Sequence, residues 1–191
     1  MTEEQLKAAT IGEPQVIGGP IELVEYDPAW PELFAREAGR IEAALGERAF
    51  RIEHVGSTSI PGLAAKPVID ILLAVADSAD EDGYVGALAE AGYVLRIREP
   101  DWYQHRMLKG RSPIVNLHVF PEGCPEIERM LLFRDRIRSN KADCALYELT
   151  KRELAQKEWK YIQNYADAKG AVVEEIIARA QSVTASDNLP D

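Results

Sequence analysis

Short apolar runs alternate with longer amphipathic stretches through the first 75 residues of the chain. Residues 21–26, IELVEY, alternate between apolar and polar as a short strand does, and apolar positions then recur with helical spacing to about residue 45. Residues 49–57, AFRIEHVGS, predict a strand that runs into a glycine-serine turn. KPVIDILLAV at 66–75 is a nearly unbroken aliphatic run, which is typical of a central strand covered on both faces. A single charge, Asp70, interrupts this run.

The pattern changes from strands to helices beyond Pro125. Before that residue it predicts one further helix and three strands, over 79–91, 93–99, 102–109 and 113–120. Three helices are expected after it, at about 126–140, 143–168 and 171–181. The chain is therefore predicted to have an α+β fold, in which a sheet from the first half is packed with helices and the C-terminal half is helical.

The chain of 191 residues, with 46% apolar and 28% charged residues, fits a single globular domain. We expect this domain to span 21–181, because these residues carry the periodic pattern and no linker or repeat divides them. Residues 1–20 and 182–191 lack sustained periodicity and are expected to be flexible tails. Cys124 and Cys144 are too far apart for a Cys-x-x-Cys motif, so neither a disulfide framework nor a zinc site is expected from them.

Charge and hydropathy narrow the range of partners. Acidic residues outnumber basic ones by 32 to 22, and the formal net charge of −10 opposes attraction to nucleic acid or anionic lipid. No apolar run approaches the roughly 18 residues that a spanning helix needs, and the first residues are polar and acidic rather than a targeting signal. We therefore expect a cytoplasmic protein that binds a small molecule or nucleotide, with no nucleic-acid or membrane partner.

The turn Gly56-Ser57-Thr58 is the first candidate for chemistry. Small residues after a strand leave backbone N–H groups and hydroxyls free to hold phosphate oxygens. Gly-Ser turns are common, however, and taken alone such a turn is more often structural.

Asp70 is the second candidate, because an ionised carboxylate among apolar neighbours is costly unless something compensates its charge. A metal ion, a Lys or Arg side chain, or backbone donors could each do so. We favour a functional role, since a carboxylate near the end of a central strand is often part of a site. The alternative is a structural ion pair, for example with Lys66.

His118 is the third candidate, on a predicted strand where Asn116, His118 and Phe120 share the more polar face. A lone strand histidine is more often a hydrogen-bonded structural residue than a ligand. Pairing with Asp70 across a sheet would reverse that interpretation. His54, with Glu53 beside it, is the next possible partner.

A basic cluster on the predicted C-terminal helices is the fourth candidate. Arg134 and Arg138 lie four residues apart on one helical face, and Tyr147 and Lys151 repeat this spacing on the next helix. Such side chains could bind phosphates and border a nucleotide base. A solvated, salt-bridged face is an equally good interpretation.

Several segments together resemble the GrpB family, also designated UPF0157. They are YDPAWPELF, IEHVGSTSIPGLAAKPVIDILLAV, NLHVF, LLFRDRIR, YELTKREL and YADAKGAVVEEI, in the family's order from about Ile21 to Ala180. The GSTSIPGLAAKPVIDI block is the most specific. The resemblance implies a nucleotidyltransferase-like fold, with a mixed sheet, a Gly-Ser turn after the first core strand and an aspartate on the next. Family members also resemble a domain fused to dephospho-CoA kinase.

The resemblance also implies roles for the candidate residues. Asp70 and His118 would be catalytic and, with Glu53, would hold a divalent cation such as Mg²⁺, Mn²⁺ or Zn²⁺. Phosphates or a nucleotide would be bound by Gly56, Ser57, Thr58, Lys66, Arg134, Arg138, Tyr147 and Lys151. Active nucleotidyltransferases carry a second carboxylate two residues after the first, where this chain has Leu72. Two hypotheses follow: a transferase with an incomplete carboxylate set, and a non-catalytic ligand-binding or regulatory module on the same fold.

Overall fold

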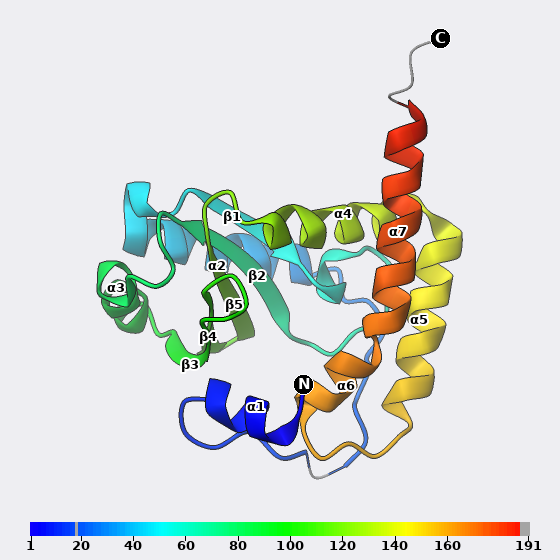
Figure 1. Ribbon diagram of the computed structural model, residues 1–191, viewed down its shortest axis with the longest axis horizontal. Coiled ribbons are helices and arrows are strands. Elements are labelled where there is room, and N and C mark those ends of the chain that lie inside the picture. Colours follow the sequence, from blue (N-terminus) through cyan, green and yellow to red (C-terminus); the bar gives the residue numbers. More distant parts are fainter. Residues whose placement is uncertain (18, 188–191) are drawn as a thin grey trace.

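Five strands form one mixed sheet in the computed structural model, which describes residues 1–17 and 19–187 (Figure 1). The strands are β1 (Arg51–Val55), β2 (Ile69–Val75), β3 (Val94–Glu99), β4 (His105–Arg111) and β5 (Ile114–Pro121). Their spatial order is β1-β2-β5-β4-β3. Only the central pair β2–β5 is parallel, and the other neighbours are antiparallel.

Seven α-helices surround the sheet: α1 (Glu3–Ala9), α2 (Trp30–Leu45), α3 (Val85–Glu90), α4 (Pro125–Ser139), α5 (Lys141–Ala155), α6 (Ile162–Ala168) and α7 (Gly170–Asp187). Short 3₁₀ turns lie at Gly46–Arg48, Ser57–Ser59 and Glu81–Gly83. Helices α5 and α7 lie side by side at one end of the molecule, and α4 runs from them across the sheet (Figure 1).

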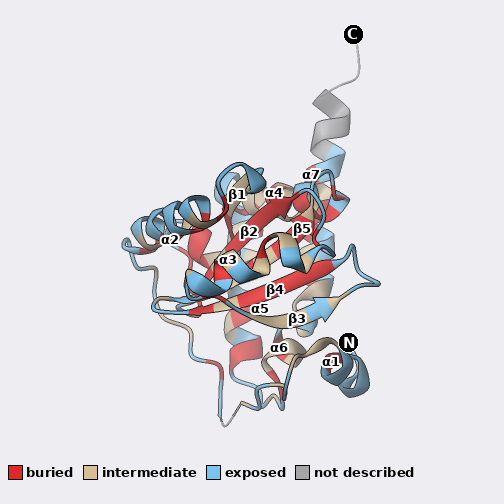
Figure 2. Ribbon diagram, turned by 90° about the vertical axis from the view of Figure 1, so that its left-hand side faces the viewer, coloured by how far each residue is buried: buried red, intermediate tan, exposed pale blue. Residues whose placement is uncertain are grey.

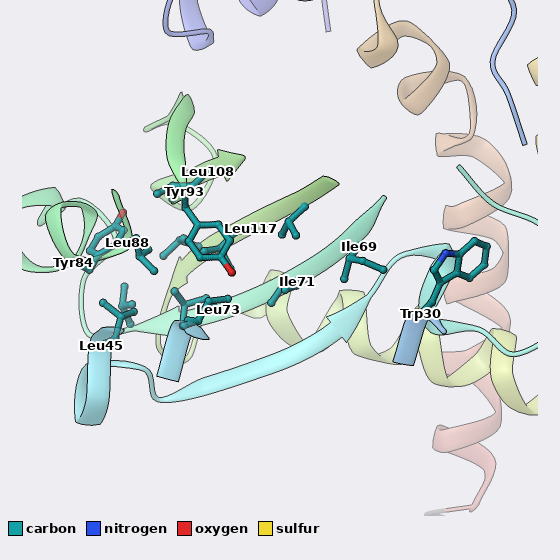
Figure 3. Close-up of a cluster of buried hydrophobic side chains, with 14 of the residues drawn as sticks. Trp30, Leu45, Ile69, Ile71, Leu73, Tyr84, Leu88, Tyr93, Leu108 and Leu117 are labelled. Carbon is teal, nitrogen blue, oxygen red and sulfur yellow. The ribbon is translucent and has the colours of Figure 1, made fainter. Parts of the chain in front are cut away.

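One face of the sheet packs against α2 and α3. Alternate residues of β2 and β5 point to this face because side chains alternate along a strand, and they meet Trp30, Leu45 and Leu88 from the helices (Figure 3). Burial is concentrated in the central strands, whereas the outer sides of α2 and α3 are exposed (Figure 2). This apolar layer is the main core, and it holds β2 and β5 in place from behind.

The opposite face is covered only in part. Helix α4 packs over Leu72, Ala74 and Phe120 through its own apolar residues. Beyond it, α5 and α7 pack against the loop that follows the Ser57–Ser59 turn. The beginnings of β2 and β5 lie outside the apolar cluster under α4, and the polar side chains of these strands lie there.

The predicted strands of the sheet and the helix ending near residue 45 are confirmed, but three predicted elements differ. The helix predicted over 79–91 is limited to α3, Val85–Glu90, and a 3₁₀ turn precedes it. Residues 21–26 do not form a strand: only Val24 pairs, in an isolated bridge with Ala65. The single helix predicted over 143–168 is divided into α5 and α6. The division follows from local hydrogen bonds. The Trp159 indole donates to the carbonyl of Leu154 at 2.8 Å, and the N–H of Tyr161, the residue before α6, donates to Oδ1 of Asn164 at 3.1 Å.

Residues 1–20 were expected to be a flexible tail, but the segment is largely structured. Helix α1 begins with a capping box at Thr2 and buries Leu6. Thr10 then forms a bridge with Ile97 of β3, and Val16 forms one with Tyr161. At the other end, α7 continues to Asp187, and the rest of the expected C-terminal tail, 188–191, lies outside the described residues.

None of the helices in the described part of the chain is both long enough and apolar enough to cross a membrane.

Leu73 provides a test of the main core, because its side chain is fully buried at 0% exposure while Leu149 on α5 is 58% exposed. Leu73→Ala is expected to lower the free energy of unfolding by about 2–5 kcal/mol, through lost burial and the cavity left behind. The same substitution at Leu149 should change it by no more than about 0.5 kcal/mol. Urea unfolding of both variants measures this, and equal effects would contradict the assignment of the core.

Candidate functional site

Strand pairing brings three polar side chains together on the partly covered face. The parallel register places Asp70 opposite Asn116 and Leu72 opposite His118. Asp70, Asn116 and His118 therefore project from the same face of neighbouring strands, because residues two apart on a strand point the same way. We call these three residues the Asp70 cluster. The pairing of His118 with Asp70 across the sheet, which would favour a functional interpretation of His118, is thus present in the structure.

Asp70 makes one hydrogen bond within this cluster. Its Oδ1 accepts from the Asn116 side-chain amide at 2.8 Å, and Nε2 of His118 lies 3.7 Å from the same oxygen. Burial acts to raise the pKa of Asp70, but His118, Asn116 and Lys66 outweigh it and hold this pKa below its usual value. The side chain is still 27% exposed. The cluster therefore presents an ionised carboxylate and an imidazole to solvent.

The Gly-Ser turn lies directly against Asp70. Gly56 has φ of +70°, a conformation that side chains disfavour, and a Cβ atom there would lie 2.9 Å from the Cβ of Asp70 and overlap its Oδ2. Only glycine leaves room for both the turn and the carboxylate. The close approach explains why the turn and the aspartate occur together in the sequence.

The hydroxyls of the turn have different surroundings. Thr58 is buried, and its Oγ1 donates to the carbonyl of Val68 at 3.1 Å and contacts Nε2 of His54 at 3.0 Å. Ser59 donates to the carbonyl of Gly56 at 2.7 Å. By contrast, neither the hydroxyl nor the N–H of Ser57 has a hydrogen-bond partner among the described residues. Of the predicted phosphate-binding residues in the turn, Ser57 is thus free to contact a ligand and Thr58 is occupied.

Three lysines add positive charge beside the Asp70 cluster. Lys109 is paired directly with Asn116 in the register of β4 and β5. The Nζ atoms of Lys66 and Lys169 lie over the ring of Tyr165, at 5.7 and 4.8 Å from its centre. Within residues 1–17 and 19–187 none of the three lysines forms a salt bridge. Burial, with repulsion from Lys169 and Lys109, lowers the pKa of Lys66 to about 8, although Asp70 acts in the opposite direction. This charge is available to an anion.

A second histidine contacts the cluster and was not predicted. Nε2 of His105 lies 3.1 Å from Nδ1 of His118, and Nδ1 of His105 lies 2.7 Å from Oε2 of Glu99. His105 is 3% exposed, and burial lowers its pKa to about 4. Its ring stacks on Phe120 at 4.7 Å and meets Trp102 edge-on at 5.0 Å. Glu99 and His105 are directly opposed at the turn end of the predicted strand pair, which is the sequence signal that could have identified them.

Glu53, a predicted metal ligand, lies on the same face but is held by arginines. Its carboxylate pairs with Arg134 at 2.7 Å and with Arg51 at 3.1 Å, and in the register it faces Leu72 rather than Asp70. No group of three His, Cys, Asp or Glu side chains suited to a metal occurs in the described part of the chain. The structure thus brings together Asp70 and His118 of the predicted ligand set, without Glu53.

The predicted basic cluster donates hydrogen bonds to backbone carbonyls on either side of the Gly56 turn. Arg134 donates to the carbonyl of His54 at 3.2 Å, and Arg138 donates twice to the carbonyl of Ser59, at 3.1 and 2.9 Å. Lys151 is buried, donates to the carbonyl of Ala64 and lies over the ring of Tyr147, 5.0 Å from its centre. Burial lowers the pKa of Lys151 to about 7. These contacts agree with a structural role, and the predicted ligand contacts of these four residues stay a prediction.

His54, considered as an alternative partner for His118, lies on the opposite face of the sheet. Its ring stacks on Phe34 of α2 with 4.7 Å between the ring centres and 7° between the planes. Burial lowers its pKa to about 4.

Comparison with known proteins finds relatives over nearly the whole chain. The family model described as GrpB protein matches residues 20–179. The chain is 56% identical to a UPF0157 protein of Halalkalibacterium halodurans, over 95% of this chain and 93% of that protein. A crystal structure of the conserved protein GrpB from Enterococcus faecalis has a TM-score of 0.74 and 33% identity, and the match covers 85% of this chain and 99% of that chain.

One relative carries a different name. The chain is 32% identical over 182 residues to a dephospho-CoA kinase of Mycolicibacterium paratuberculosis, covering 81% of this chain but 44% of that protein.

Gly56 provides a test of the contact between the turn and Asp70. Gly62 is a matched control, since its φ of +79° is also positive but nothing lies within 4 Å of a Cβ placed there. Gly62→Ala should cost about 1–2 kcal/mol of stability through backbone strain alone. Gly56→Ala should cost about 1–3 kcal/mol more, because its methyl group overlaps Asp70. Denaturant unfolding measures both, and similar values would show that the turn does not press on the carboxylate.

Proposed function

The chain belongs to the GrpB family, and we propose that its Asp70 cluster binds a nucleotide or another phosphorylated small molecule together with one divalent cation. The observation that carries the proposal is the position of the Asp70 carboxylate, between the Gly56 turn on one side and Asn116 and His118 on the other. A carboxylate in this position can bind a cation while the turn and the nearby lysines hold the anion that accompanies it.

The cation is proposed to bind between Asp70 Oδ1 and His118 Nε2. These atoms are 3.7 Å apart, and both are on side chains that solvent reaches. An oxygen and an imidazole nitrogen together suit Zn²⁺ or Mn²⁺ better than Mg²⁺, which prefers oxygen ligands alone. Water or phosphate oxygens would complete the coordination, since the described residues offer no third ligand.

The phosphate is proposed to lie between the turn and the lysines. Ser57 offers a free hydroxyl and a free N–H group, and Lys66, Lys109 and Lys169 offer charges with no carboxylate bonded to them. An anion here would relieve the repulsion that helps to lower the pKa of Lys66. The chain is acidic overall, so this local concentration of positive charge favours a small anion over a long polyanion.

A transfer reaction is the more demanding form of the proposal. On a nucleotidyltransferase-like fold, the cation and lysines would stabilise charge on a transferring nucleotidyl or phosphoryl group, and a small molecule would accept it. Asp70 and His118 are the residues that would touch the reacting centre. The likeness to a dephospho-CoA kinase supports a nucleotide or coenzyme precursor as the ligand class.

A non-catalytic binding module is the second candidate function, and the position of Leu72 favours it. Leu72 occupies the place where a second carboxylate would be needed, and it is fully buried in the apolar cluster beneath α4. Chemistry that requires two metal ions lacks a ligand there, whereas binding through Asp70 and His118 does not need it.

Asp70→Asn tests the cation site. The variant can keep the hydrogen bond from Asn116 but loses the charge, so metal-dependent binding should be lost while the fold remains. Thermal unfolding with Mn²⁺ or Zn²⁺ and a panel of ATP, CTP and dephospho-coenzyme A measures the gain in stability, which is about 2.7 kcal/mol at 100 times the dissociation constant.

Asp82, exposed in the 3₁₀ turn at Glu81–Gly83, provides the control, because Asp82→Asn changes the net charge equally. It should leave the metal-dependent gain unchanged. If the metal-dependent gain in stability survives in Asp70→Asn, Asp70 is not part of the site. If the unaltered protein shows no gain with any ligand of the panel, these nucleotides and dephospho-coenzyme A are not its ligands.

Leu72→Asp and Leu72→Asn separate the two candidate functions. Both bury a polar group under α4 and should destabilise the protein by about 2–4 kcal/mol, and the charged aspartate variant should be the less stable of the two. If the protein is a binding module, neither variant should gain nucleotidyl transfer, measured as pyrophosphate release from ATP. A gain with aspartate but not asparagine would instead indicate an enzyme that lacks one carboxylate.

A further inference from the structure

We propose that Glu99 and His105 are positioning residues that set the tautomer of His118, so that its Nε2 presents a lone pair toward Asp70. The inference deepens the proposed function and rests on it for its purpose, because a lone pair at this atom is what a cation between His118 and Asp70 requires. We call the chain of contacts from Glu99 through His105 and His118 to Asp70 the relay. Its three contacts are between protein side chains alone, so they can be tested without a ligand.

The first contact fixes the proton on His105. A carboxylate can only accept hydrogen bonds, so the 2.7 Å contact between Glu99 Oε2 and His105 Nδ1 places a hydrogen on Nδ1. A neutral imidazole carries one N–H group, and Nε2 of His105 is therefore an acceptor.

The second contact determines which nitrogen of His118 carries the hydrogen. Nε2 of His105 lies 3.1 Å from Nδ1 of His118, and an acceptor at that distance requires His118 to donate from Nδ1. In the neutral form of His118, which carries a single N–H group, Nε2 then has no hydrogen. Histidines that bind metals are commonly held in this way, by a hydrogen bond from the nitrogen that does not touch the metal.

The third contact has the spacing of a ligand pair rather than of a hydrogen bond. His118 Nε2 and Asp70 Oδ1 are 3.7 Å apart, which is longer than a hydrogen bond. Two ligands of a tetrahedral Zn²⁺, each about 2.1 Å from the metal, lie about 3.4 Å from each other. The Asn116 amide also donates to Oδ1, at 2.8 Å. Two acceptors therefore face one another at a separation that a cation can bridge.

Packing keeps the relay in one arrangement. The His105 ring stacks on Phe120, meets Trp102 edge-on and also stacks on the His118 ring, with the His105 and His118 centres 5.3 Å apart. His105 is buried and Glu99 is half-buried, so water competes little for their hydrogen bonds. Rotation of His105 would break both of its contacts at once.

The test measures the tautomer of His118 directly in the full chain, without metal or ligand. Long-range ¹H–¹⁵N spectra of the ¹⁵N-histidine protein at neutral pH should show Nδ1 of His118 protonated and Nε2 unprotonated. In His105→Phe, which keeps a ring against Phe120 and Trp102 but removes both nitrogens, His118 should change to the Nε2–H form. Protonation of Nε2 in the unaltered protein would overturn the proposal.

Zinc affinity gives the second readout, by calorimetry with ZnCl₂. His105→Phe should weaken binding about 10–100-fold, the usual effect of losing a hydrogen-bond partner of a metal ligand. Glu99→Gln should weaken it less, and this variant keeps the proposal testable if His105→Phe does not fold. Trp102→Phe changes the packing around His105 but none of its hydrogen bonds, and it should match the unaltered protein. An equal loss in Trp102→Phe would mean that packing alone is responsible and would overturn the relay.

The two readouts separate the relay from the proposed function. If His118 has the expected tautomer and changes it in His105→Phe, but Zn²⁺ and Mn²⁺ do not bind, the relay is confirmed and the cation site of the proposed function is rejected.

Discussion

The parallel pairing of β2 with β5 is the constraint on which the rest of the molecule depends. It places Asp70 beside Asn116 and Leu72 beside His118, and any shift by one residue would turn the polar side chains into the apolar layer under α2. A parallel pair needs a long connection, and here β3 and β4 with α3 provide it. The same connection adds β4 next to β5 and thereby brings His105 to His118. One pairing therefore organises both the core and the site.

The polar residues near the site divide into those that face the open surface and those that hold it. Asp70, His118 and Ser57 have groups that solvent reaches. Arg138 and Lys151 instead donate hydrogen bonds to backbone carbonyls of the loop. Those carbonyls would otherwise be left unsatisfied where the loop is buried, which is costly. The position of the turn against Asp70 thus depends on helices α4 and α5, and Arg138 and Lys151 contribute to the site by holding its loop in place.

The sequence pattern predicted the sheet strands and which side chains of a strand share a face, because side chains alternate along a strand. The pattern left the pairing of Asp70 with His118 open, and only the family resemblance implied it. The pattern did not predict the role of Lys151, since an i, i+4 spacing identifies a helical face but not the surface that this face packs on. His105 was missed for a related reason: its partner Glu99 is fixed by a turn whose register the pattern leaves open. Helix α1 was missed although its capping box, Thr2 to Gln5, is visible in the sequence.

The N-terminal segment gives the sheet a protected edge. Thr10 pairs with Ile97, and the N–H of Ile11 donates to the carbonyl of Arg96 at 2.8 Å, so part of the outer side of β3 already has a partner. An uncovered edge strand offers its hydrogen-bonding groups to any other extended chain and favours aggregation. The residues shared with the family model begin at residue 20, after this segment. A chain shortened to the shared residues would keep the Asp70 cluster but would leave this part of β3 open to pairing with a neighbouring molecule.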